Sequence, residues 1–288
     1  MQRIFLFLTL MISQVASSQL YIGGFVGGSG YDGDLNDKPF KRIKPSVGAT
    51  VSFPLTNRLH LRTGILLGGL EGGDKWSGTT FLKQNRNLSF SSDLTEISVV
   101  GELNAFNLNK IAWTPYVFGG IAVFHFNPYV IDSGERIYLK PLSTEGQGLS
   151  GYPNRKAYSL VQFSIPFGGG IKYLIKENVL LSFELGFRRT MTDYLDDVST
   201  TYVDENDLLQ QRGLTAVQLS YRADEVPGST SEYPDNGYPL KSVQRGSAKY
   251  KDWYYFAGFH LNFRLNNGVG KNAAKEKKSY GCATMVPM

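Results

Sequence analysis

The sequence has few of the residue types that build reactive or metal-binding centres. Its 288 residues include one cysteine, Cys282, and three histidines, His60, His125 and His260. A single cysteine excludes a disulfide within the chain and a cluster of thiolate metal ligands. The 30 basic side chains outnumber the 25 acidic ones only slightly. That excess is too small to indicate a nucleic-acid partner.

Long apolar runs are missing as well. The apolar stretch at residues 4–12 is too short to cross a bilayer as a helix, which needs about 20 residues, and no later window qualifies. With Arg3 before it and small residues just after it, this stretch predicts a cleaved secretory signal peptide over residues 1–18. We therefore expect an exported protein that begins near Gln19 and folds without disulfides.

Glycine and aromatic residues are abundant, with 32 Gly, 18 Phe and 17 Tyr, which favours strands over helices. The segment VLLSFELGFR, residues 179–188, alternates strictly between an apolar row and a row of mainly polar or small residues. This pattern is typical of a strand with one apolar face. It recurs in five further segments, at 46–53, 60–68, 96–105, 164–173 and 255–264. Two more strand-like segments, at 20–31 and 116–126, are apolar or glycine on both rows, so the sequence does not decide which row faces outward. No helix pattern is evident.

The connections between these eight segments alternate in length. The short ones are 54–58, 107–113 and 176–178, and the long ones are 32–44, 71–93, 127–159 and 190–251. Outer-membrane barrels have short periplasmic turns and long outer loops. The sequence thus predicts an all-β protein: an eight-stranded antiparallel transmembrane β-barrel over residues 19–265, in the outer membrane of a Gram-negative bacterium. A flexible basic tail over residues 266–288 would follow on the periplasmic side.

Charge separates the two rows of these strands. The apolar rows carry no charge, whereas the opposite rows hold Arg62, Glu96, Glu102, Lys172, Glu184, Arg188 and Arg264. An Arg or Lys facing the bilayer midplane costs about 2–4 kcal/mol. The charged rows should therefore face the interior. An eight-stranded barrel has little room beyond its side chains, so we expect these charges to pair and fill the lumen instead of lining a pore.

Two acidic stretches suggest metal sites. Asp32, Asp34 and Asn36 match the first ligands of a calcium loop, but Asp37 stands where that loop needs glycine and Ile43 where it needs glutamate. We interpret this stretch as a turn at the outer rim, with weak calcium binding as the alternative. Residues 190–207 hold six acids and no base between Thr190 and Asp207. We interpret them as solvated loop charge, with a cation site or docking surface as the alternative.

The three histidines do not suggest an active site. Nothing in the sequence brings His60, His125 or His260 together with a serine and a third polar group, as a hydrolase would require. We therefore assign no catalytic, cofactor-binding or metal-binding residues. We expect no enzymatic activity, no cofactor and no small-molecule substrate.

Several motifs occur in a characteristic order: GGSGYDGDLN, TPYVFGG followed by FHFNP, YLKPLSTEGQGLSGYP, SIPFGGGIKY and RRTMTDYLDDVS. Together they resemble the PorG-like outer-membrane β-barrel family of the type IX secretion system. TEGQG, at 144–148, and TDYLDDVS, at 192–199, are long loop motifs that a generic barrel has no reason to share. The resemblance covers nearly all the mature chain.

The resemblance implies a non-enzymatic component of the protein secretion machinery that links a periplasmic ring of PorK- and PorN-like proteins to the outer membrane. Such contact would use the short-turn side, with Ile111 and Trp113 as apolar candidates, together with the basic tail. The lysines that make this side positive are Lys110, Lys176, Lys271, Lys275, Lys277 and Lys278. Trp113 can alternatively be read as an interfacial belt residue. Outer-membrane lipid would be the other partner. The alternative function is a stand-alone small barrel, either a minor channel or a surface ligand-binding or adhesin-like protein.

Overall fold

The computed structural model describes residues 20–36, 40–76, 86–226 and 237–265. The predicted signal peptide (1–18), the predicted basic tail (266–288) and Cys282 lie outside these residues. The strands are β1 (Leu20–Asp32), β2 (Lys44–Pro54), β3 (Leu59–Gly73), β4 (Ser89–Asn104), β5 (Trp113–Asp132), β6 (Glu135–Tyr138), β7 (Val161–Lys176), β8 (Val179–Thr190) and β9 (Trp253–Leu265).

Eight of these strands close into a barrel. The sheet order β4-β3-β2-β1-β9-β8-β7-β5 is completed by pairing of β4 with β5, and all neighbours are antiparallel. The first and last strands meet along their whole length, from Leu20 opposite Leu265 to Asp32 opposite Trp253. β6 pairs only with the outer end of β5. The predicted eight-stranded antiparallel barrel is thereby confirmed.

The outer surface of the barrel is apolar. Along β8 the row of Phe183 faces outward, while Ser182, Glu184 and Arg188 are buried inside. The structure also shows which row faces outward in the two strands that the sequence left undecided. Val26 of β1 is 62% exposed and Ile121 of β5 is 68% exposed, so their rows face outward. The outward row recurs around the barrel in Ile22, Val47, Ile65, Leu67, Ile97, Val99, Val117, Phe163, Ile165, Ile171, Phe259, Leu261 and Phe263. Apolar rows facing outward all round the barrel identify it as a membrane-spanning barrel of the outer-membrane type.

Several strands are longer than predicted: β5 runs to Asp132, into the connection expected at 127–159, and β3 and β4 also extend. β3 continues to Gly73 and β4 already begins at Ser89, so the ladder runs five pairs beyond the predicted ends, from Gly69 opposite Asp93 to Gly73 opposite Ser89. The connection expected at 71–93 is therefore shorter than predicted. These ends consist largely of glycine, serine and acidic residues, and a strand that leaves the bilayer needs no apolar row.

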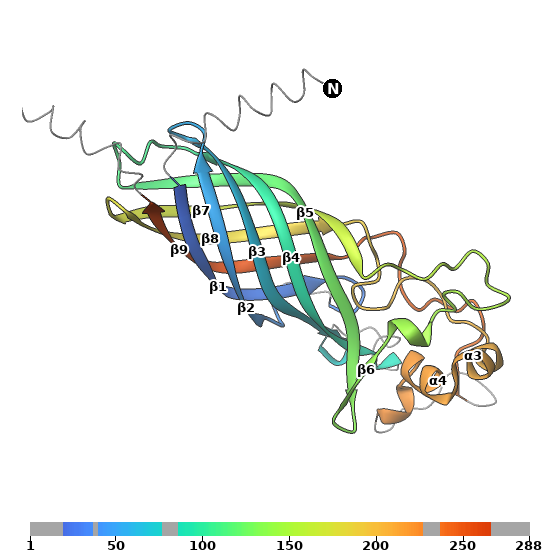
Figure 1. Ribbon diagram of the computed structural model, residues 1–288. Coiled ribbons are helices and arrows are strands. Elements are labelled where there is room, and N and C mark those ends of the chain that lie inside the picture. Colours follow the sequence, from blue (N-terminus) through green and yellow to red (C-terminus); the bar gives the residue numbers. More distant parts are fainter. Residues whose placement is uncertain (1–19, 37–39, 77–85, 227–236, 266–288) are drawn as a thin grey trace, which may run out of the picture.

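The described parts of the long connections form a cap at one end of the barrel, at the lower right of Figure 1, while the short turns lie at the opposite end. The cap contains α3 (Glu205–Arg212), α4 (Leu214–Ser220) and the short 3₁₀ turns η1 (Asp74–Trp76), η2 (Lys140–Leu142) and η3 (Ala223–Glu225). It has its own core of Leu149, Tyr152, Tyr202, Val203, Leu208, Ala216, Val217 and Tyr238. None of the helices among the described residues is long and apolar enough to span a membrane.

Two short helices form in this cap although the sequence shows no helix pattern. The α3 sequence, ENDLLQQR, has only two apolar residues, of which Leu208 is buried and Leu209 is exposed. The carboxylate of Asp204 caps the helix by accepting from the backbone N–H groups of Asn206 and Asp207. The helix is therefore held by its cap and by one buried leucine, which is too little to produce a helical apolar period.

Candidate functional sites at the two ends of a filled barrel

The lumen of the barrel is occupied by ion pairs. Arg62 lies between two glutamates, with Nε 3.0 Å from Glu102 Oε1 and Nη1 2.7 Å from Glu184 Oε2. The ammonium of Lys172 reaches the other oxygen of Glu102. All four side chains are buried and come from four different strands, β3, β4, β7 and β8. They tie the walls of the barrel together across its interior.

A second ion pair lies nearer the cap. Arg188 Nε is 3.0 Å from Glu96 Oε2, and the hydroxyl of Tyr254 donates to the same oxygen at 2.9 Å. Six of the seven charges predicted to face inward are buried, and the seventh, Arg264, is half-buried at the short-turn end. A cavity of about 10 Å³ beside Arg62 and Glu102 is the size of a single water molecule. These side chains fill the interior as the sequence predicted.

The three histidines lie in three separate parts of the barrel. His260 lies in the lumen, with Nε2 3.3 Å from Arg62 Nη1 and 3.6 Å from Glu184 Oε2. His60 is buried near the short turns, and His125 is exposed on the outer face of β5. No hydrogen bond in the described part of the chain joins a histidine to a serine or threonine hydroxyl.

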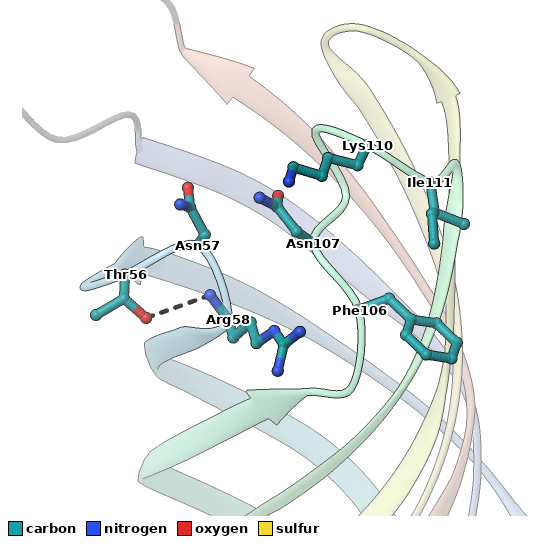
Figure 2. A pocket seen from close by; sticks show the side chains of 7 residues that line it. All are labelled: Thr56, Asn57, Arg58, Phe106, Asn107, Lys110 and Ile111. Atoms are coloured by element: carbon teal, nitrogen blue, oxygen red, sulfur yellow. Dashed lines mark hydrogen bonds between the residues drawn. The ribbon is translucent and has the colours of Figure 1, made fainter.

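The short-turn end carries a surface pocket of about 420 Å³, shown in Figure 2. Two turns form it, the one between β2 and β3 and the one between β4 and β5. The hydroxyl of Thr56 accepts from the backbone N–H groups of Arg58 and Leu59, and the side-chain oxygen of Asn107 accepts from the N–H of Asn109. Such side-chain-to-backbone bonds fix tight turns. The pocket walls are therefore preformed.

The chemistry of this pocket is apolar and basic. Phe106 and Ile111 are both partly exposed in it, and the exposed side chains of Arg58 and Lys110 line the same pocket. The pocket is lined further by Thr56, Asn57 and Asn107, so no carboxylate is among its lining residues. Neither Arg58 nor Lys110 forms an ion pair within residues 20–36, 40–76, 86–226 and 237–265. An apolar side chain next to an acidic group would fit this arrangement.

Ile111 and Trp113, the two apolar candidates from the sequence, have different positions. Ile111 lines the pocket, whereas Trp113 does not. Trp113 opens β5 and faces outward, where its partner across the ladder is the exposed Tyr173. Its ring also packs edge-on against Phe106, with ring centroids 5.4 Å apart. This position is that of an interfacial aromatic belt residue.

At the opposite end, the two loop motifs that carry the family resemblance meet. Thr144 of TEGQG donates its hydroxyl to Asp197 of TDYLDDVS at 2.5 Å. Glu145 accepts from the backbone N–H of Ser199 at 2.9 Å and from both the N–H and the hydroxyl of Thr200. Arg245 donates to Glu145 Oε1 at 3.1 Å and to the carbonyl of Asp197 at 2.6 Å. The motifs thus build the buried polar centre of the cap.

The interpretation of residues 190–207 as solvated charge was wrong for three of the six acids. Asp193, Asp196 and Asp197 are all buried. Burial raises the pKa of Asp197 to about 6, even though Arg245 and two hydroxyl donors favour its charged form. No local pattern could indicate this burial, because the groups that cover these acids come from distant loops.

The first acidic stretch is a turn, as interpreted. Gly33 and Asn36 form a bridge, and Asn36 donates its side-chain amide to the carbonyl of Tyr31 at 2.7 Å. Asp34 accepts from the backbone N–H of Ser247 at 2.8 Å. Within the described ranges there is no group of three or more His, Cys, Asp or Glu side chains that could hold a metal ion. Weak calcium binding stays a prediction, because residues 37–39 of this stretch lie outside the described ranges.

Asp193 should make the cap sensitive to pH. Burial raises its pKa to about 6, and of its two oxygens only Oδ2 has a hydrogen-bond partner among the described residues, the hydroxyl of Ser199. Lys251 opposes this rise, while Asp34 and Glu145 add to it. The unfolded pKa is about 3.9, so the folded cap binds more protons between about pH 4 and pH 6. Its stability is therefore highest below that window and falls as the pH rises through it.

We expect limited proteolysis of the cap to be faster at pH 7 than at pH 5. The ratio of the two rates should be larger in the natural protein than in the Asp193→Asn variant. The variant cannot ionise at this position, and it shares every other pH effect, including that on the protease. It is therefore the matched control. Identical ratios in the two proteins would contradict the prediction.

The comparisons with known proteins add a family and several distant structures. Among solved structures, the chain is similar to Neisserial surface protein A (6% identity, TM-score 0.41, covering 85% of this chain and 97% of that one). It is also similar to a major outer membrane protein from Thermus thermophilus (11%, 0.41, 86% and 99%) and to the outer membrane protein OprG from Pseudomonas aeruginosa (10%, 0.39, 86% and 97%). No curated protein matches the chain significantly. Residues 2–213 match the family described as Domain of unknown function (DUF6089), and because this match spans most of the sequence, the chain belongs to that family.

Proposed function

We propose that this protein is a non-enzymatic accessory barrel of the type IX protein secretion machinery, and that it links a periplasmic ring to the outer membrane. The observation that carries the proposal is the pocket at the short-turn end, which is lined by the apolar Phe106 and Ile111 and by the basic Arg58 and Lys110. In outer-membrane barrels the short turns face the periplasm. The partner, a PorK- or PorN-like ring protein, is supplied by the resemblance of the loop motifs.

The filled lumen supports a binding role over transport. The Arg62 and Arg188 networks occupy the interior from the short-turn end towards the cap, and moving either arginine would leave a buried glutamate without its partner. Breaking buried pairs of this kind is costly. A barrel of this size therefore offers its two ends, and not its interior, for function.

The pocket is of a size and kind suited to anchoring a partner. An interface gains most of its affinity from a few well-packed apolar or aromatic anchors, while exposed charges at its rim contribute steering and specificity. Phe106 and Ile111 would pack against such an anchor. Arg58 and Lys110 would then attract an acidic ring surface.

The test combines a gene deletion with one pair of point variants. Ile111→Asp places an acid in the pocket lining, and Leu55→Asp places one on an exposed leucine of the β2–β3 turn that does not itself line the pocket. We expect the deletion and Ile111→Asp to prevent cargo from reaching the cell surface. Ile111→Asp should also lose co-purification of the ring proteins from detergent, while Leu55→Asp should behave as the natural protein.

A stand-alone surface barrel is the second candidate function. It is favoured by the cap, whose separate core gives the extracellular side a folded surface that could bind a ligand. Normal cargo localisation in the deletion strain, with no ring protein recovered in pull-downs, would reject the secretion proposal in favour of this one.

A further inference from the structure

A second pocket, of about 480 Å³, lies in the cap between the β5–β6 hairpin, the η2 turn and the end of α3. Its volume is in the range of sites for small ligands, about 300–1,000 Å³. Six side chains give it its chemistry: Asn127, Tyr138, Lys140, Ser143, Gln147 and Arg212. We propose that this pocket binds a short saccharide that carries an acidic group.

Two amide side chains of the pocket have unused hydrogen-bonding capacity. Gln147 is only 3% exposed, and its Oε1 accepts from the backbone N–H of Glu145 at 3.1 Å. Its Nε2 is buried without a partner among the described residues, and so is Oδ1 of Asn127. Buried polar atoms are rarely left unpaired in proteins. A small rotation of these side chains towards the pocket would let the donor and the acceptor bond hydroxyl groups, which can both accept and donate.

The charge of the pocket is positive. Lys140 and Arg212 line it, and no acidic residue is among its lining residues. Arg212 uses Nε to hold the hydroxyl of Ser143 at 3.2 Å and Nη1 to hold the carbonyl of Gln211 at 3.0 Å. Neither cation forms an ion pair in the part of the chain that the structure describes. A carboxylate or phosphate is the group that two unpaired cations recognise best.

The remaining wall is aromatic and apolar. Tyr138 is 42% exposed, with its ring held against Tyr129 at a centroid distance of 6.0 Å, and Pro141 and Leu160 lie around the same pocket. An exposed tyrosine offers a flat apolar face with a polar tip. A sugar ring has matching apolar faces and a rim of hydroxyls, so the pocket fits a sugar better than a simple inorganic anion.

The loop that supplies Gln147 is rigid. Gly146 has φ +80°, and a Cβ there would lie 2.6 Å from Cγ1 of Val203, so only glycine fits. Ser143 also adopts the left-handed region, with φ 51°. The neighbouring Glu145 is fixed by Ser199, Thr200 and Arg245. The backbone that carries Gln147 is therefore held in place, which lowers the entropy cost of binding.

The position of the pocket allows two sources of such a saccharide. Asn127 belongs to the barrel strand β5, and Leu160 immediately precedes β7, so the pocket adjoins the rim of the barrel. The sugar could belong to a glycolipid of the outer leaflet or be free in the medium. The recognised chemistry is the same in both cases.

The test is calorimetric titration of the full-length protein in detergent with trigalacturonate, neutral maltotriose and tetraglutamate. We expect trigalacturonate to bind and the other two to bind at least about tenfold more weakly, because each lacks either the charge or the sugar. No heat of binding with trigalacturonate up to about 10 mM would overturn the proposal. Equal binding of tetraglutamate would overturn the choice of a saccharide.

Variants locate the binding in the pocket. Arg212→Gln and Lys140→Gln should each weaken trigalacturonate binding by about tenfold or more. Lys241→Gln removes a cation of the cap that does not line the pocket and should change nothing. Folding of each variant is checked by its heat-modifiable gel mobility. Unchanged binding in both pocket variants would overturn the proposal.

A third arm separates the sources. Vesicles containing intact lipopolysaccharide and the deacylated saccharide of the same lipopolysaccharide are compared as probes. Binding of both, weakened by Arg212→Gln, supports recognition of the sugar of a membrane glycolipid, and binding of trigalacturonate alone supports a free acidic glycan. Vesicle binding that Arg212→Gln leaves unchanged, without binding of either free saccharide, would assign recognition to the barrel wall and reject the pocket.

Discussion

Replacement of Glu96 by glutamine is expected to destabilise the barrel by about 3–5 kcal/mol, the usual cost of removing one partner of a buried ion pair. The substitution keeps the shape of the side chain but removes the charge opposite Arg188. Arg188 is buried in the lumen with its guanidinium over the ring of Phe256, and Tyr254 donates to the same glutamate. The measurement is the urea midpoint for unfolding in lipid vesicles, followed by the heat-modifiable gel shift.

Two variants act as controls for this prediction. Glu96→Gln combined with Arg188→Met removes both charges and should recover much of the lost stability, because no buried charge is left alone. Asp93→Asn breaks the solvent-exposed pair with Arg136 and should leave the midpoint almost unchanged. If Glu96→Gln unfolded at the same urea concentration as the natural protein, the lumen network would not be a structural element.

Replacement of Phe183 by arginine should strongly reduce the amount of barrel that assembles in the membrane. Phe183 is the middle member of the outward row of β8 and packs against Phe259 of β9, with ring centroids 5.3 Å apart. An arginine near the bilayer midplane costs about 2–4 kcal/mol. The fraction of heat-modifiable protein in outer-membrane preparations reports this loss.

Phe183→Leu is the matched control, because it keeps the position apolar and should assemble normally. A one-residue shift of register would turn position 183 towards the lumen and the charged row towards the lipid. Normal assembly of Phe183→Arg would therefore mean that the rows of β8 are exchanged, and that the ion pairs of Glu184 and Arg188 do not form.

The sequence was most informative where the membrane imposes a constraint. In β8, lipid on one side and the charged lumen on the other force strict alternation, and the predicted strand begins at the observed residue, Val179. β3 and β4 show the limit of this signal. Beyond Gly68 and before Leu94 both faces meet water or the cap, the alternation disappears, and the strand ends were missed.

The cap and the pockets could not be predicted, because their contacts are made between distant segments. Glu145 and Arg245 are 100 positions apart, and Arg58 and Ile111 come from separate turns. A local sequence pattern does not indicate contacts between segments so far apart in the chain. The nearest signal was the pair of motifs TEGQG and TDYLDDVS, which a generic barrel does not need and which the structure joins through Thr144 and Asp197.

The closing pair of strands determines the order in which this protein can be assembled. β9 completes the barrel by pairing with β1, and it follows the segment between Thr190 and Trp253 that holds α3 and α4. Once the seam is shut, the lumen is blocked by Arg62, Arg188 and their partners, and that segment can no longer cross. The cap segment must therefore cross to its own side of the membrane while the wall is still open. Closure of the barrel wall follows that passage and keeps the segment on the cap side.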